Sequence, residues 1–123
     1  MNAYISTSCF PNTTLFDNIN ICSEITEGFV ELSAPHPFIE IKNIIKMLLN
    51  FKKKNINFTL HNYFPPQKED FILNFSTSIP KNKNLNKKLI EESLEICKQI
   101  SSPVYGVHPG YLYESSKKNE NGL

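Results

Sequence analysis

A chain of 123 residues is long enough for one domain with a modest core, and its net charge of +1 gives no general attraction to nucleic acid or to an anionic membrane. Hydrophobic residues form 40% of the chain and charged residues 20%, which is typical of globular proteins. Lysine supplies all the permanent positive charge and arginine is absent, which disfavours bidentate recognition of phosphate.

Apolar strand-like segments and amphipathic segments alternate along the chain. In chain order the predicted elements are a strand at 3–10, a helix at 13–25, a strand at 29–34, a helix from 38 to KKKN (52–55), a strand at 56–60, a helix at 85–100 and a strand at 104–108. Each predicted strand is a short apolar run, and each predicted helix repeats apolar residues every three or four positions.

The apolar spacing within the helices predicts which sides are buried. The three stripes are Leu15, Ile19 and Cys22; Phe38, Ile41, Ile45 and Leu48, widened by Ile44 and Leu49; and Leu85, Leu89, Ile96 and Ile100. Thr14 with Asp17 resembles a capping box at the start of the first helix, and Gly28 is a natural stop after it. The lysines of 52–55 suit the C-terminal end of the second helix dipole.

Alternation of strand and helix predicts a parallel sheet with right-handed crossovers. Such a sheet either closes into a (β/α)₈ barrel or stays open. A complete barrel takes about 250 residues, so this chain corresponds to about half of one. We therefore predict a partial (β/α)₈ TIM barrel across residues 1–123, with about four parallel strands and three helices. It is a fragment, a truncated product or a half-barrel that needs a partner; a four-stranded open α/β sheet is the alternative.

Neither end of the chain predicts a targeting segment or a second domain. The N-terminal MNAYISTSCF lacks the basic start and apolar core of a secretory signal, and the apolar IIKMLLNF is interrupted by Lys46 and too short to span a bilayer. The three cysteines are widely spaced without a C-x-x-C pair, which favours reduced thiols. We expect a cytoplasmic protein without a membrane partner. The polar tail at 114–123 is expected to be disordered.

Two histidines end neighbouring predicted strands. His61 follows the third strand directly, and His108 closes the fourth. Functional groups of parallel α/β proteins collect at the carboxyl ends of strands, so the two imidazoles are expected at one edge of the sheet. Neutral imidazole is a common metal ligand, and two of them can share one ion. Two histidines that only hydrogen-bond at the rim are the alternative, and His36 is interpreted as a loop residue.

Four further residues are candidates for substrate binding at the same end. Glu31 lies within an apolar strand, where an unpaired buried carboxylate is costly, so it is expected to face a site. Cys9 ends the first strand, although a small buried thiol is the common outcome. Asn62 and Tyr63 begin the long connection 61–84, whose aromatic residues and prolines predict a wall over the site.

These segments resemble a known superfamily. TLHNYFPP…FILNFSTS, then a helix, then VYGVHPGYL is similar to the third- and fourth-strand regions of xylose-isomerase-like TIM barrels, in particular of their endonuclease-IV-like branch. STSCFP and VELS are similar to the first two strands of its sugar-isomerase-like members. The resemblance implies that His61 and His108 bind a divalent metal, zinc or manganese. It also implies that the remaining ligands, and the catalytic acid and base, come from a missing C-terminal half.

Three functions follow as expectations. The first is a metal-dependent sugar or sugar-phosphate isomerase/epimerase that takes a small carbohydrate, inactive as this fragment and partnered by a second copy or by the missing C-terminal half. The second is an apurinic endonuclease, which ranks lower because a DNA-sized basic groove is not evident. The third is a non-catalytic truncated copy, whose unpaired strand edges invite dimerisation.

Overall fold

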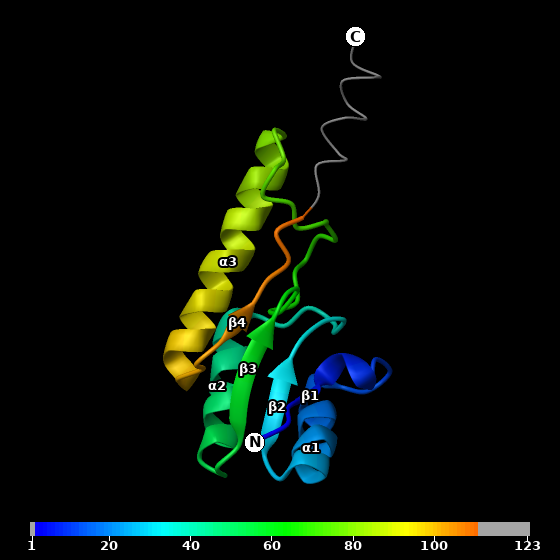
Figure 1. Cartoon of the computed structure of the whole chain (residues 1–123), viewed down its shortest axis with the longest axis vertical. Coiled ribbons are helices and arrows are strands. Elements are labelled where there is room, and N and C mark those ends of the chain that lie inside the picture. The colour runs from blue at the N-terminus through cyan, green and yellow to red at the C-terminus, as the bar shows by residue number, and fades with distance from the viewer. Residues whose placement is uncertain (1, 111–123) are drawn as a thin grey trace.

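The computed structural model describes residues 2–110, which form an α/β fold with a four-stranded parallel sheet and three helices (Figure 1). The elements are β1 (Ile5–Ser6), the 3₁₀ turn η1 (Thr7–Cys9), α1 (Leu15–Thr26), β2 (Phe29–Leu32), α2 (Ile41–Lys52), β3 (Asn57–His61), α3 (Pro80–Ile100) and β4 (Tyr105–Gly106). The strands lie in the order β1-β2-β3-β4 and every neighbouring pair is parallel. The predicted alternation and the parallel sheet are confirmed. The predicted tail at 114–123 lies outside the described residues.

The three helices pack on one face of this sheet (Figure 1). Val30 and Leu32 of β2 and Phe58 and Leu60 of β3 point into the core, and side chains of all three helices meet them. The alternate strand residues, which point to the other face, are only partly buried. Within residues 2–110 no helix lies over that second face, which we call the open face. It consists of Tyr4, Ser6, Phe29, Glu31, Asn57, Thr59, His61 and Gly106.

Helix α1 begins and ends where the sequence predicts, to within two residues. The Thr14 hydroxyl accepts a hydrogen bond from the Asp17 backbone N–H, which confirms Thr14 as the N-cap, and it donates to the Asp17 carboxylate. The helix ends at Thr26 because Glu27 and Gly28 both adopt positive φ. A larger residue would be crowded at position 28, because a Cβ there would lie 3.2 Å from the Asn55 carbonyl oxygen. Leu15, Ile19 and Cys22 are all buried, as predicted.

The outer strands are shorter than predicted. Only Ile5–Ser6 of the segment 3–10 pairs with the sheet, because the chain turns into η1 immediately afterwards. The Ser6 hydroxyl accepts a hydrogen bond from the Ser8 backbone N–H, a local bond that competes with a continued strand. The last strand is likewise reduced to Tyr105–Gly106 of the predicted 104–108.

The two later helices start elsewhere than predicted. Helix α2 begins at Ile41, and Phe38 remains 41% exposed in the preceding loop. The buried side of α2 is centred on Ile44, Leu48 and Phe51. Ile44 and Leu48 of the predicted stripe are therefore confirmed, but the centre of the stripe is rotated away from Ile41, Ile45 and Leu49.

Helix α3 begins at Pro80, five residues before the predicted start. Proline at the first helical position needs no hydrogen-bond partner for its nitrogen and has a helical φ. The polar run from Lys81 to Asn84 therefore forms the exposed first turn of the helix. None of the helices in the described part of the chain is long and apolar enough to cross a membrane.

Candidate metal site at the carboxyl edge of the sheet

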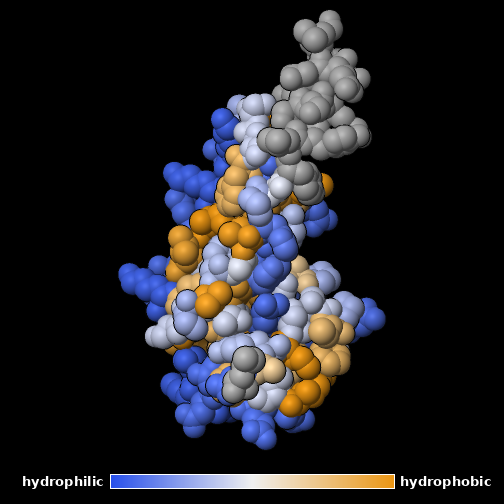
Figure 2. All heavy atoms as spheres, in the orientation of Figure 1, coloured by the Kyte–Doolittle hydropathy of each residue, from blue (hydrophilic) through white to orange (hydrophobic). Residues whose placement is uncertain are grey.

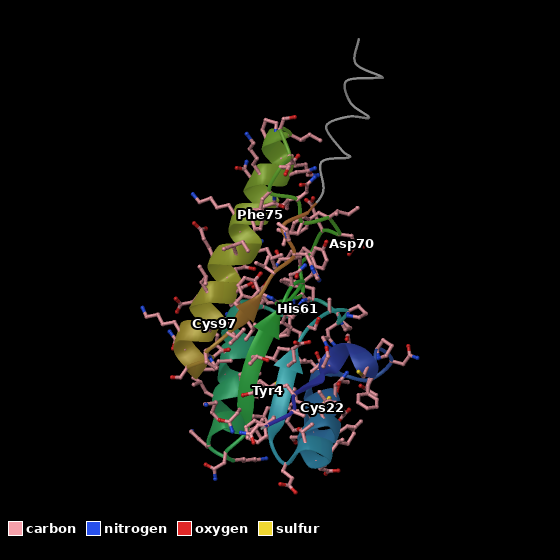
Figure 3. All side chains as sticks on the ribbon, in the orientation of Figure 1. Tyr4, Cys22, His61, Asp70, Phe75 and Cys97 are labelled. Carbon is pink, nitrogen blue, oxygen red and sulfur yellow. The ribbon has the colours of Figure 1, made fainter. Side chains whose placement is uncertain are left out.

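The structure brings His61 and His108 together. His61 is the last residue of β3, and His108 follows β4 by two residues, so both lie at the carboxyl edge of the sheet. Their imidazole rings meet edge to face, with centroids 4.9 Å apart and an interplanar angle of 76°. Figure 3 shows His61 at the end of its strand, on the side of the molecule where the long connection begins. The two imidazoles therefore lie next to each other at one edge of the sheet, as expected.

Asn62 makes three hydrogen bonds that join His61 at the end of β3 to the segment from Gly106 to His108. Its backbone carbonyl accepts from His61 Nδ1 at 2.8 Å, its side-chain Oδ1 accepts from the His108 backbone N–H at 3.2 Å, and its own N–H donates to the Gly106 carbonyl at 3.0 Å. Asn62 is 5% exposed. Its side-chain amide thus couples the end of β3 to the segment that carries His108.

The hydrogen bond of His61 determines which ring nitrogen is free. A carbonyl oxygen only accepts, so Nδ1 of His61 carries the proton and Nε2 of the neutral ring carries the lone pair. Histidine ligands of metals usually donate their other ring N–H in this way, because the bond orients the ring and makes the ligating nitrogen more basic. The donor chemistry of His61 therefore fits a divalent metal bound through Nε2.

The long connection packs against the segment that follows His108. The Pro109 carbonyl accepts from the Phe75 backbone N–H at 3.1 Å, and Gly110 lies so close to Asn74 that a Cβ on Gly110 would stand 2.6 Å from the Asn74 Cα. The side chain of Asn86 on α3 donates to the Asn74 carbonyl at 2.8 Å. The segment after β4 is thus held against the connection, and the connection against α3.

Tyr63 faces a neighbouring cleft rather than the histidine pair. Its hydroxyl accepts from the Leu73 backbone N–H at 3.0 Å, and its ring meets Phe71 edge to face. With His36 and Asp70 it lines a cleft of about 210 Å³ between the loop after β2 and the connection after β3. The cleft lies at the carboxyl end of the sheet, beside the loops that follow β2 and β3.

His36 is held by a network that the sequence did not predict. The Thr7 hydroxyl donates to the Ser33 carbonyl and accepts from the Ser33 N–H, so it accepts from Nε2–H of His36 at 3.0 Å. Burial lowers the pKa of His36 below its usual range. The proline-flanked APHPF pattern indicated a turn, but no local signal links residues 29 positions apart.

Glu31 and Cys9 do not join the histidines directly. Glu31 lies on the open face, in register with Ser6 and Thr59, one layer below His61. Cys9 is exposed in η1 and neighbours Cys22, whose pKa is raised to about 11 by burial and by Cys9. No group of three or more His, Cys, Asp or Glu side chains that could hold a metal forms within residues 2–110. The described chain thus offers two imidazoles, which is half of a tetrahedral ligand set.

No family model, curated protein or solved structure matches the chain.

Proposed function

We propose that the chain is half of a xylose-isomerase-like (β/α)₈ barrel whose function is metal-dependent isomerisation or epimerisation of a small sugar or sugar phosphate. In this proposal His61 and His108 are two ligands of one divalent ion, Zn²⁺ or Mn²⁺. The observation that carries the proposal is the contact of the two imidazoles at the carboxyl edge of a parallel sheet, with Nε2 of His61 free.

The arrangement of layers supports a barrel half. The four strands follow one another in sequence order and are all parallel, and the helices cover one face only. In a (β/α)₈ barrel the helices lie outside, the other face lines the interior, and active sites lie at the carboxyl ends of the strands. The open face then corresponds to the interior and the histidine pair to the rim of the active site.

In this proposal the described residues position the metal ligands and provide a surface that contacts the substrate. A bound divalent ion would polarise the carbonyl and hydroxyl oxygens of a sugar and so ease removal of a neighbouring proton. Asn62 orients the His61 imidazole and holds the backbone of His108, and Glu31 points to the same interior one layer below. Tyr63 and Asp70 border the adjacent cleft, where the hydroxyl and the carboxylate can hydrogen-bond to sugar hydroxyls. We assign no catalytic acid or base to these residues.

The test is metal binding by the whole chain. We expect Zn²⁺ or Mn²⁺ titrated into the purified protein to bind, and the His61→Ala/His108→Ala double variant to lose at least about tenfold in affinity. The His36→Ala variant is the matched control, because it removes a histidine that lies outside the pair. Equal metal content in the wild type and the double variant, measured by mass spectrometry, would refute the proposal. Cleavage of abasic duplex DNA by the metal-loaded protein would favour an endonuclease instead.

A further inference from the structure

The open face has the location of a core layer, yet no helix among residues 2–110 covers it. Parallel sheets are normally covered on both faces, since their connections place helices on each side or close them into barrels. Here the described helices pack on one face, and Tyr4 remains 37% exposed on the other, edge to face with Phe29. Tyr4 lies in front of the strands in Figure 3. A tyrosine–phenylalanine pair in this position is typical of a buried or interfacial layer.

The distribution of charge also indicates a covered surface. Every lysine in the described part of the chain lies on a helix or a loop, and Glu31 is the one formally charged residue on the four strands. Figure 2 views this face: orange patches alternate with hydrophilic residues, and the hydrophilic side chains that project furthest lie at its margins. Interface cores are depleted in charged residues in the same way.

Within the described residues the two edges of the sheet are two-residue strands whose outer sides are unpaired. Strands β1 and β4 each have one neighbour among the described residues, so the outer side of each presents unpaired backbone groups. Neither strand contains lysine or proline, the residues that usually block further pairing at an edge. Both strands run in the same direction, so β4 of one sheet can pair in parallel with β1 of another.

We infer that a second copy of this chain covers the open face, and that two copies together close one eight-stranded barrel. A twofold axis parallel to the strands places β4 of each copy beside β1 of the other and keeps all eight strands parallel. Eight strands leave an interior that side chains alone can fill. Phe29 and Thr59, which are partly buried in one chain, would become fully buried in that interior.

The second copy also completes the metal site, an extension that rests on the proposed function. Both copies bring their carboxyl edges to the same rim, so His61 and His108 of each copy surround the twofold axis. Three of these four imidazoles can bind one ion and leave its fourth position to a substrate oxygen, as in catalytic zinc sites. One ion is therefore bound per two chains.

Sedimentation of the full chain over a range of concentrations tests the interface. We expect a dimer, and we expect Thr59→Lys to raise its dissociation constant at least about 100-fold, because the substitution places a charge at the centre of the covered face. Asn84→Lys on the outer surface of α3 is the matched control and should leave the dimer unchanged. Tyr4→Lys provides a second disruption should the Thr59 variant lose its circular-dichroism spectrum. A monomeric wild type, or a dimer indifferent to both open-face variants, would overturn the inference.

Metal stoichiometry separates this inference from the proposed function. Half an equivalent of Zn²⁺ per chain, lost in the His61→Ala/His108→Ala variant, supports both. A monomer that binds one equivalent through the same histidines would leave the metal site standing and refute the shared barrel. A dimer that dissociates in Thr59→Lys, yet holds metal independently of the histidines, would support the interface and refute the shared ion together with the proposed function.

Discussion

Gly106 of β4 lies directly beneath the imidazole of His61 on β3, so close that a Cβ at residue 106 would stand 2.9 Å from Cδ2 of the ring. The two residues are register partners in the sheet. The hydrogen bond from Nδ1 of His61 to the Asn62 carbonyl limits how far the ring can turn away. The absence of a side chain at residue 106 therefore sets the position of the imidazole.

Gly106→Ala should weaken metal binding more than it weakens the fold. The added methyl displaces the His61 ring and its Nε2, and a misplaced ligand costs about 10–100-fold in metal affinity. The free energy of unfolding should change by only about 1 kcal/mol, because the displaced ring is partly exposed and can shift. Calorimetric titration with Zn²⁺ and urea unfolding of the same preparation give both quantities. Unchanged affinity would show that the ring position does not matter to the metal.

Asn62→Ala should lower the stability and loosen His108. The substitution removes the side-chain oxygen that accepts from the His108 backbone N–H and keeps the carbonyl that His61 uses. Loss of one such hydrogen bond costs about 1 kcal/mol. Asn57→Ala at the start of β3 is the control, because the Asn57 amide makes one long bond of 3.4 Å to the Asn55 carbonyl. If both variants lost the same free energy of unfolding in urea, the bond from Asn62 to His108 would contribute nothing specific to stability.

The histidine pair was predictable because it depends on two local facts. Each histidine follows an apolar strand-like run, and strands separated by one helix are neighbours in a parallel sheet. The same reasoning placed Glu31 correctly on a strand. It did not predict the hydrogen bond that holds the two histidine segments together, because the bond between Asn62 and His108 joins residues 46 positions apart.

The rotation of α2 shows a different limit of periodicity. The segment IIKMLLNF is apolar on several sides, so one stripe through Ile41 and Ile45 and another through Ile44 and Phe51 fit the sequence about equally. Packing of α2 against α3 and the sheet selects the second stripe. The choice between the two stripes therefore depends on tertiary contacts, which the spacing of apolar residues does not reveal.

The three thiols should differ in reactivity according to burial. Attack requires the thiolate, and burial raises the pKa of Cys22 to about 11 and also raises the pKa of Cys97. Cys9 is exposed. At pH 8 we expect one fast reaction with a disulfide reagent in the folded protein and three after denaturation. The fast reaction should disappear in Cys9→Ser; its survival would mean that Cys22 or Cys97 is accessible.

His36 should make the protein less stable as the pH falls. Burial lowers the pKa of its imidazole in the fold, whereas the unfolded chain has a value of about 6.5. Below that pH the unfolded state therefore binds more protons than the folded state, and the stability contributed by neutral His36 is lost until the folded pKa is reached. The buried Nδ1 has no hydrogen-bond partner within the described chain, so a proton there would be unsatisfied. Urea unfolding between pH 5 and pH 8 should give a shallower decline for His36→Asn than for the wild type. Parallel declines would assign the acid sensitivity to other groups.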